Sequence, residues 1–221
     1  MPEASRTAGA AERSAPTTDL GRVPFAAVWP RMHEVAAAIH DRTAPCGEIL
    51  LVEHDPVYTA GRASRDEVLA DDVVRIERGG RVTYHGPGQL VVYPIVPLPR
   101  RDVRAWLRSL EALGVAVCES FDLEAKASVD GTGVFVARTD GSWSKVVSIG
   151  VAIKRWVNLH GIAINFDMDL AAFHRIRPCG LDPDVVGDLS RAAGRRIGRA
   201  EVVAAVEAAL PVLGLGAESA R

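Results

Sequence analysis

The chain has 221 residues, of which 48% are hydrophobic and 24% charged, and its formal net charge at pH 7 is −2. This length and apolar content predict a single large domain with a substantial core. The balanced charge argues against a nucleic-acid-binding or membrane-surface protein, and no apolar run reaches the roughly 18 residues that a membrane-spanning helix needs.

The N-terminal residues differ in composition from the rest of the chain. Residues 1–19 mix charged and small residues without the apolar core of a secretory signal, so we expect a disordered tail and one domain over residues 20–221. The three cysteines, Cys46, Cys118 and Cys179, are odd in number and far apart. This argues against a disulfide framework and for a reducing compartment, so we expect a cytoplasmic protein.

The first half of the domain shows one amphipathic pattern and several apolar runs bounded by Gly, Pro or Asp. The amphipathic pattern predicts a helix over residues 26–40. The apolar runs predict strands over residues 20–25, 48–53, 73–78, 81–84 and 89–96, with a polar helix or loop at 66–72.

The second half continues with a helix over residues 102–121, whose apolar residues fall on one face. The later predicted elements are a hairpin of strands 133–137 and 145–153, a strand over 156–166, a short helix over 169–173, a loop over 175–180 and a final helix over 199–210. Strands outnumber helices, and short turns join them. We therefore predict an α+β fold, a single domain with mixed, largely antiparallel sheets flanked by helices.

Several common catalytic signatures are absent from the sequence. No segment matches the phosphate-binding loop, and Gly131 and Gly133 are not followed by the third glycine of a dinucleotide-binding fingerprint. Ser148 lacks the leading glycine of a nucleophile elbow, and the six histidines never fall at zinc-ligand spacing. None of these chemistries therefore has sequence support.

The densest candidate site is the segment 78–89, RGGRVTYHGPGQ. Its four glycines allow the backbone to adopt positive φ and to approach a ligand closely, and polar and aromatic side chains lie between them. An ordinary glycine-rich hairpin is the alternative interpretation. The number of polar and aromatic residues at the turn favours a binding loop.

Cys179 is the candidate nucleophile. It lies in a turn between Pro178 and Gly180, with Arg175 and Arg177 close by in the sequence, and positive charge favours the reactive thiolate. An inert, packed cysteine is the alternative, since that is the more common state of free cysteine.

The other two cysteines provide a comparison. Cys46 repeats the Pro-Cys-Gly tripeptide without a polar constellation beside it, so we interpret it as structural or exposed. Cys118 lies within a predicted helix beside Val117, so we interpret it as a core residue.

Lys145 is the candidate proton-transfer residue. It is one of only three lysines and begins the apolar strand 145–153, where partial desolvation would suit an amine to acid–base chemistry. A solvated strand end is the alternative, and we assign that role to Lys154. In the next strand, alternation places Asn158 and His160 on one face, where His160 is either a site residue or a core histidine.

Taken together, these motifs resemble those of the lipoyl(octanoyl) transferases, the octanoyl-[acyl-carrier-protein]:protein N-octanoyltransferases. The resemblance covers roughly residues 20–205, with the motifs in the family's order and near its spacing. The matching segments are Arg78–Gln89 except position 81, Lys145-x-x-Ser148-Ile149-Gly150-Val151, His160-Gly161-x-Ala163-x-Asn165, Pro178-Cys179-Gly180, and earlier His54-x-Pro56-Val57-Tyr58-Thr59 with Gly61-Arg62.

The resemblance implies a fold like the catalytic domain of biotin and lipoate protein ligases. It implies transfer of octanoyl from octanoyl-acyl carrier protein to the target lysine of lipoyl domains, in lipoate biosynthesis. The acceptors would be the lipoyl domains of 2-oxoacid dehydrogenase complexes and the glycine cleavage H protein. No metal, nucleotide or other cofactor is implied.

The resemblance also assigns roles to individual residues. Cys179 would carry the acyl-thioester intermediate, with Lys145 as its catalytic partner. Substrate contacts would fall on Arg78, Gly79, Gly80, Arg81, Val82, Thr83, Tyr84, His85, Ser148, Ile149, Gly150, His160, Gly161, Ile162 and Ala163.

The chemistry that follows is a two-step acyl transfer. Lys145 would accept the Cys179 proton and later that of the incoming amine, and backbone N–H groups of the glycine-rich segments would stabilise the oxyanion. We expect Val146, Val147 and Ile149 to line one wall of an apolar slot for the acyl chain. Two alternatives stay open: an ATP-dependent lipoate- or biotin-protein ligase on the same fold, and a non-catalytic module that binds carrier protein or acyl chains.

Overall fold

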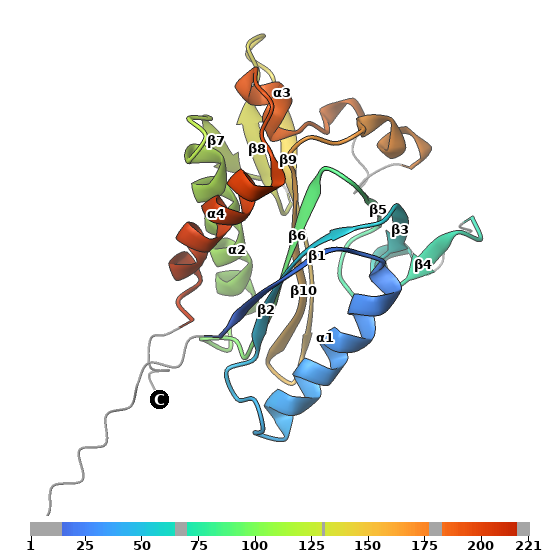
Figure 1. Cartoon of the computed structure of the whole chain (residues 1–221), viewed down its shortest axis with the longest axis vertical. Helices are drawn as coiled ribbons and strands as arrows, with labels where there is room; N and C mark the ends of the chain where they lie inside the picture. Colours follow the sequence, from blue (N-terminus) through green and yellow to red (C-terminus); the bar gives the residue numbers. More distant parts are fainter. Residues whose placement is uncertain (1–14, 65–69, 130, 177–182, 216–221) are drawn as a thin grey trace, which may run out of the picture.

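A twisted seven-stranded sheet forms the centre of the molecule (Figure 1). The structure, a computed structural model, describes residues 15–64, 70–129, 131–176 and 183–215. The strand order of this large sheet is β1 (Thr17–Val23), β2 (Glu48–His54), β6 (Gln89–Ile95), β10 (Val157–Asn165), β9 (Trp143–Lys154), β8 (Val134–Ala137) and β7 (Ala125–Ala127). Only β1 and β2 pair in parallel, and the other neighbours are antiparallel.

A second, three-stranded sheet lies beside the first. Its order is β4 (Val73–Arg75), β3 (Val57–Ala60) and β5 (Val82–His85), with β3 parallel to β4 and antiparallel to β5. The chain passes directly from β5 in the small sheet to β6 in the large one, across the turn of residues 86–88. The glycine-rich segment therefore joins the two sheets.

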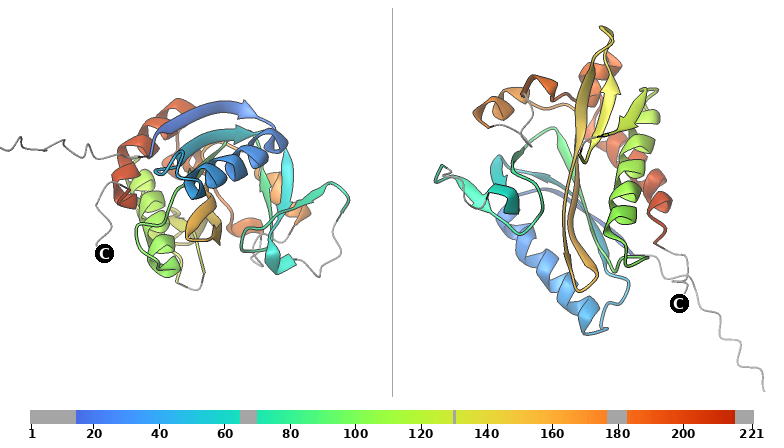
Figure 2. Two further views of the ribbon diagram at one scale, coloured as in Figure 1. Left: turned by 90° about the horizontal axis from the view of Figure 1, so that it is seen from below. Right: turned by 180° about the vertical axis from the view of Figure 1, so that it is seen from behind.

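Helices cover both faces of the large sheet. Helix α1 (Phe25–His40) packs on one face, and α2 (Val103–Glu119) and α4 (Arg199–Ala209) pack on the other (Figure 2). Strand β6 shows how its sequence fits this position: Leu90 and Val92 belong to the core cluster that includes α2, whereas Val91 and Tyr93 belong to the cluster that includes α1. Because successive side chains of a strand face opposite sides, a strand covered on both faces is apolar throughout.

The helices begin and pack as their sequences require. Helix α2 begins after Asp102, whose side chain accepts a hydrogen bond of 2.9 Å from the Ala105 N–H, and it buries Trp106, Leu110 and Leu113. The shorter helices are η1 (Arg62–Ser64), η2 (Leu170–Arg175), η4 (Pro183–Val185), α3 (Leu189–Ala193) and η5 (Leu210–Leu213). None of the helices within the described ranges combines the length and apolar character that crossing a membrane demands.

The predicted fold class, α+β with mixed and largely antiparallel sheets, is confirmed. The predicted helices 26–40, 102–121 and 199–210 correspond to α1, α2 and α4. The short strands β3 and β7 and helix α3 are not predicted by the sequence, because each has five residues or fewer and too little periodicity to detect.

The first strand begins earlier than the sequence predicts. Strand β1 begins at Thr17 and pairs with Ile49 of β2, so residues 17–19 of the expected tail belong to the sheet. The strand is at the sheet edge, and its partly exposed Thr-Thr-Asp start has the polar composition of a tail. Residues 1–14 of the expected tail lie outside the described residues.

Candidate active site

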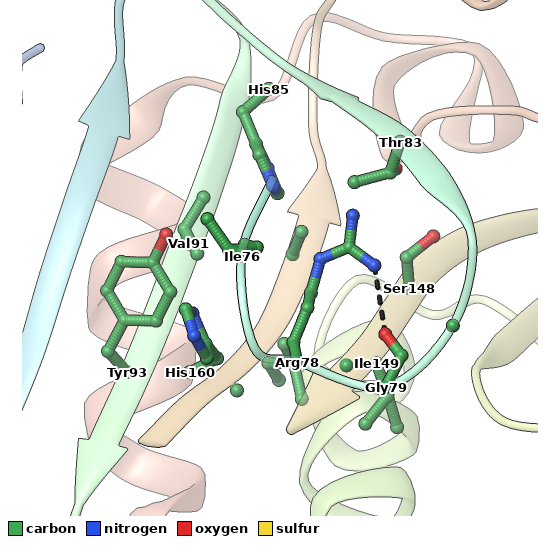
Figure 3. Close-up of a pocket in the computed structure, with 15 residues that line it drawn as sticks. Ile76, Arg78, Gly79, Thr83, His85, Val91, Tyr93, Ser148, Ile149 and His160 are labelled. Atoms are coloured by element: carbon green, nitrogen blue, oxygen red, sulfur yellow. Dashed lines mark hydrogen bonds between the residues drawn. The ribbon is translucent and has the colours of Figure 1, made fainter. Parts of the chain in front are cut away.

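A pocket opens between the two sheets (Figure 3). It contains about 480 Å³ of space not filled by atoms, its open mouth included. Its walls come from the loop before β5, from β5 itself, and from the middle of β6, β9 and β10. The lining residues are Ile76, Arg78, Gly79, Gly80, Thr83, His85, Val91, Tyr93, Ser148, Ile149, Gly150, His160, Gly161, Ile162 and Ala163.

The pocket gathers most of the predicted substrate-contact residues, which are far apart in the sequence. The exceptions are Arg81, Val82 and Tyr84, which do not line it. Thr83 and His85 face the pocket, so the alternation of side chains along β5 turns Val82 and Tyr84 to the other side. There the Tyr84 ring packs against other aromatic rings, those of Tyr58 and Phe173.

Three lining residues are absent from the prediction: Ile76, Val91 and Tyr93. Val91 and Tyr93 could have been predicted from the alternation of side chains along β6, which places both on the α1 side of the sheet. The sequence places Ile76 in a strand over residues 73–78, but β4 ends at Arg75. The residues after it leave the strand and form a wall of the pocket.

Arg78 lies buried in that wall, with 7% of its surface exposed, and its guanidinium ties the loop together. Nη2 donates to the carbonyl oxygen of Thr59 at 2.7 Å and to its hydroxyl at 2.9 Å. Nη1 donates to the carbonyl oxygens of Gly79 at 2.9 Å and Arg81 at 2.8 Å. The Gly79 N–H in turn donates to the Val151 carbonyl at 2.9 Å, so the loop is fixed to both sheets.

The four glycines of segment 78–89 serve two purposes. Gly79 and Gly80 line the pocket, as expected for close approach to a ligand. Gly86 and Gly88 instead allow the turn to pack closely. A Cβ at Gly88 would lie 2.1 Å from the Asp167 carbonyl oxygen, and one at Gly86 would lie 2.3 Å from the hydroxyl of the Tyr84 side chain.

Two buried histidines pack beside each other next to the pocket, and of these only His85 lines it. The Nδ1 atom of His85 lies 2.6 Å from Oε1 of Gln89, and Nε2 of His54 lies 3.0 Å from the Tyr93 hydroxyl. Burial, together with the nearby His54 ring, lowers the pKa of His85 to about 3, and burial also lowers the pKa of His54. Burial raises the pKa of Tyr93. All three rings are therefore uncharged at neutral pH, which suits an apolar ligand.

His160 and Asn158 face opposite sides of the large sheet, and the prediction that they share a face is wrong. The Asn158 side chain accepts a hydrogen bond of 2.9 Å from Nε1 of Trp106 in α2. The His160 ring lies against Tyr93 on the α1 side, and the two labelled side chains are neighbours in Figure 3. His160 has a φ of 61°, which interrupts the alternation of side chains along β10.

Lys145 is buried, with only 6% of its surface exposed, although it is near the start of β9. Its Nζ donates to the Thr132 carbonyl oxygen at 3.0 Å and lies 6.0 Å from the centre of the Phe135 ring. It precedes the pocket residue Ser148 by three positions, about 10 Å along a strand. The alternative of a solvated strand end is excluded for Lys145, whereas Lys154 is exposed as predicted.

Cys179, with Pro178 and Gly180, lies outside the described residues. The described chain resumes at Pro183, and Val186 then forms a parallel bridge with Lys145. The Gly187 N–H donates to the Lys145 carbonyl oxygen at 2.9 Å. The chain that follows Cys179 thus passes beside Lys145 within seven residues.

The structure also describes Arg175, which is predicted to supply positive charge near Cys179, and the other two cysteines. The Arg175 side chain lies 3.2 Å from the carboxylate of Asp72, so its charge is paired. Cys118 is a core residue as predicted, and burial raises the pKa of its thiol to about 12. Cys46 is partly exposed, which agrees with its interpretation as structural or exposed.

The predicted apolar wall is correct only in part. Ile149 lines the pocket, but Val146 and Val147 are fully buried in the core cluster beneath α2 and do not line it. Apolar lining residues from other elements take their place: Ile76, Val91, Ile162 and Ala163.

Comparison with known proteins gives a consistent family assignment. The family model described as the lipoyl protein ligase A/B catalytic domain matches residues 29–211. An octanoyltransferase from Geobacter metallireducens is 40% identical over 200 residues, which cover 88% of this chain and 91% of that protein. An octanoyltransferase from Geobacter sulfurreducens is 43% identical over 206 residues, covering 91% of this chain and 84% of the relative.

Solved structures share the fold at low sequence identity. A lipoate-protein ligase A bound with ATP has a TM-score of 0.64 and 15% identity, covering 91% of this chain and 85% of its own. A bipartite lipoate protein ligase from Thermoplasma acidophilum has a TM-score of 0.63 and 15% identity, covering 90% and 83%. A biotin protein ligase from Aquifex aeolicus has a TM-score of 0.52, 15% identity and coverage of 90% and 70%.

Proposed function

The chain belongs to the family of the lipoyl protein ligase A/B catalytic domain and catalyses octanoyl transfer in lipoate biosynthesis, and we propose that it does so through an acyl-thioester on Cys179 with Lys145 as proton-transfer partner. The donor is octanoyl-acyl carrier protein. The acceptor is the target lysine of a lipoyl domain, either in a 2-oxoacid dehydrogenase complex or in the glycine cleavage H protein. We place this reaction in the cytoplasm.

The observation that carries the proposal is the position of Lys145. Its amine is buried and donates one hydrogen bond to Thr132, while the chain that follows Cys179 runs along its backbone at Val186 and Gly187. An ammonium group has three donors, so two more N–H bonds can be directed at a thiolate and a substrate. A buried cation that favours the thiolate is what nucleophilic cysteine requires.

The proposed chemistry balances in two steps. In the first, Lys145 Nζ takes the Cys179 proton, and the thiolate attacks the donor thioester carbonyl. The new S–C bond forms, the carrier thiolate leaves, and the lysine ammonium returns the proton to it. In the second, the acceptor amine attacks the acyl-enzyme, the N–C bond forms as the S–C bond breaks, and the amine proton passes through Lys145 to the Cys179 thiolate that leaves, which restores the thiol.

The pocket is the proposed site for the octanoyl chain. Apolar side chains from four different segments line it, and the buried His85 ring in its wall is uncharged at neutral pH. Each methylene that moves from water into such a slot contributes roughly 0.8 kcal/mol to binding. We assign the substrate contacts to the predicted residues that line the pocket. On one wall these are Arg78, Gly79, Gly80, Thr83 and His85, and on the other they run from Ser148 to Gly150 and from His160 to Ala163.

The test is incubation with octanoyl-carrier protein and an apo lipoyl domain without ATP. We expect the wild-type protein to form a covalent octanoyl adduct, seen by intact-mass spectrometry, and to pass it to the lipoyl domain. Cys179→Ser should form no octanoyl adduct that is passed on to the lipoyl domain. Cys46→Ser is the matched control, because it has the same Pro-Cys-Gly context and should behave like wild type.

Two results would contradict the proposal. An adduct that persists and turns over in Cys179→Ser would remove this cysteine from the mechanism. Transfer that occurs only with free octanoate and ATP would instead favour the ATP-dependent ligase reaction, whose fold this chain shares.

A further inference from the structure

Glu77 lies in the wall of the pocket without lining it. Its neighbours Ile76 and Arg78 both line the pocket, whereas Glu77 does not. One oxygen of its carboxylate, Oε1, lies 3.1 Å from Nε2 of His160 and 3.1 Å from Nε2 of His33. Glu77 therefore connects a pocket residue to a residue outside the pocket.

These contacts join three separate elements. His160 belongs to β10 and lines the pocket, while His33 and Trp29 belong to α1. The Trp29 indole Nε1 donates to the second carboxylate oxygen of Glu77 at 3.2 Å. Arg78 ties the same loop to β3 in the small sheet, so Glu77 supplies a complementary link to the large sheet and its covering helix.

The Glu77 carboxylate is charged, and its oxygen Oε1 is shielded from solvent. Burial alone would raise the pKa of Glu77, but the close imidazole of His160, helped by His33, outweighs this and lowers it to about 2. Oε1 of Glu77 and Nε2 of His160 are both inaccessible to solvent. Because water does not reach these atoms, removal of the Glu77 carboxylate leaves Nε2 of His160 buried without a replacement for this contact.

His160 needs such a partner for a second reason. Its backbone has a φ of 61°, a conformation that residues with a Cβ adopt only when their surroundings hold them there. The ring of His160 also lies 6.2 Å from that of Tyr93, another pocket residue. A shift of His160 would therefore change the shape of the pocket on this side.

We propose that Glu77 is a positioning residue for the acyl donor, which holds His160 and the loop of residues 76–80 so that the pocket fits an octanoyl chain. This inference rests on the proposed function. Glu77 does not touch the acyl chain or the reacting atoms. It acts through His160 and through the pocket-lining residues on either side of it in the loop.

The test compares Glu77→Gln and Glu77→Ala with wild type, using octanoyl-carrier protein and a short-chain butanoyl-carrier protein as donors. The amide keeps an acceptor oxygen but loses the charge, and the alanine loses both. For octanoyl we expect KM to rise about threefold in Glu77→Gln and about tenfold in Glu77→Ala, with kcat within about twofold of wild type. For butanoyl, which fills less of the pocket, KM should stay within about twofold.

Glu34→Gln is the matched control, since Glu34 is an exposed carboxylate of the adjacent helix α1, and its KM should not change. A merely structural role would lower kcat for both donors equally by reducing the folded fraction. That result, or an unchanged octanoyl KM in both variants, would overturn the inference. If Glu77→Ala does not fold, Glu77→Gln alone decides between these outcomes.

The result also separates this inference from the function on which it rests. A wild-type protein that forms no acyl-enzyme with octanoyl-carrier protein would overturn both. Normal wild-type turnover with an unaffected KM in the Glu77 variants would overturn only the role of Glu77.

Discussion

Lys145 lies directly against Gly133, across the pairing of β8 with β9. A Cβ at Gly133 would lie 2.5 Å from the Val147 carbonyl oxygen, 2.6 Å from Cε of Lys145 and 3.2 Å from its Nζ, and the φ of Gly133 is 132°. The missing side chain at Gly133 leaves the space that the buried amine occupies.

We predict that Gly133→Ala displaces this amine and slows acyl transfer by about 100-fold, because a misplacement of about 1 Å at a reacting group costs that much. Gly141→Ala is the matched control: Gly141 has a φ of 81°, but a Cβ there would meet nothing within 4 Å beyond its neighbours in the chain. Both variants should lose about 1–3 kcal/mol of stability from backbone strain, and Gly133→Ala should lose more than Gly141→Ala because its Cβ also meets the Val147 carbonyl oxygen. Single-turnover transfer to a lipoyl domain and chemical denaturation measure the two effects. Equal rates in both variants would contradict the role given to this contact.

Lys145→Met tests the amine itself. Methionine keeps an unbranched side chain over the Phe135 ring but removes the proton-transferring group, so we expect transfer to fall by about 100-fold or more with the fold intact. Lys154→Met, at the exposed far end of the same strand, should transfer at the wild-type rate. A Lys145→Met variant with normal transfer and normal circular dichroism would exclude Lys145 from the mechanism.

The long elements of the fold can be predicted because their periodicity is strong. Helix α2 has a capping aspartate and a continuous apolar face, and β6 is an apolar run after its first residue, Gln89. Strand β3 cannot be predicted in this way, because Val57–Ala60 is only four residues long and follows directly on Pro56. Its pairing with β4 and β5 comes from tertiary contacts that local sequence does not record.

The same missing strand explains the error at the pocket wall. The alternating residues 73–78 predict a strand to Arg78, but the Arg78 guanidinium bonds to Thr59 of β3 and turns the loop away after Arg75. When β3 is not predicted, the sequence offers no partner for the Arg78 side chain. Nothing then indicates that the strand beginning at Val73 ends before Arg78. Ile76 and Glu77 are therefore absent from the predicted site, although the glycines that follow them are included.

The buried imidazole of His85 predicts a dependence of stability on pH. Its pKa is about 3 in the folded protein against 6.5 for an ordinary histidine, so the unfolded chain binds the extra proton first as the pH falls. The stabilisation is fully present above the ordinary histidine pKa of 6.5 and is lost progressively as the pH falls from there towards 3, by at most about 1.4 kcal/mol per pH unit. Urea unfolding of wild type should weaken between pH 6.5 and 5, and His85→Gln should weaken less steeply.

His174→Gln serves as the control for that experiment, because the His174 side chain is 59% exposed. It should reproduce the wild-type slope. The pKa of His54 is also lowered by burial, so His85→Gln should retain part of the slope. Identical slopes in wild type and His85→Gln would show that the His85 ring does not resist protonation in the folded state.

Two buried asparagines of β10 should separate stability from activity. Asn158 accepts from the Trp106 indole at 2.9 Å, and Asn165 donates to the Gly187 carbonyl at 2.9 Å. Substitution of either by alanine leaves a buried partner unbonded, at a cost of about 1–3 kcal/mol. Asn165→Ala should slow transfer more than Asn158→Ala, because Gly187 is bonded to the backbone of Lys145, whereas the Asn158 amide reaches only the pocket wall, where it donates to the His160 carbonyl oxygen at 3.0 Å. Equal transfer rates in both variants at a temperature where both are folded would contradict this distinction.

Ala163 offers a test of where the acyl chain lies. It lines the pocket and is buried, so Ala163→Val adds two methyl groups to space that we assign to the octanoyl chain. Each methylene displaced from the pocket forfeits roughly 0.8 kcal/mol of binding, so kcat/KM for octanoyl-carrier protein should fall about tenfold. A butanoyl donor, which needs less of the pocket, should lose about twofold or less. Ala137→Val, on β8 outside the pocket, should leave both donors unaffected. A uniform loss for both donors in Ala163→Val would indicate that the chain binds elsewhere, because a narrowed slot must discriminate by length.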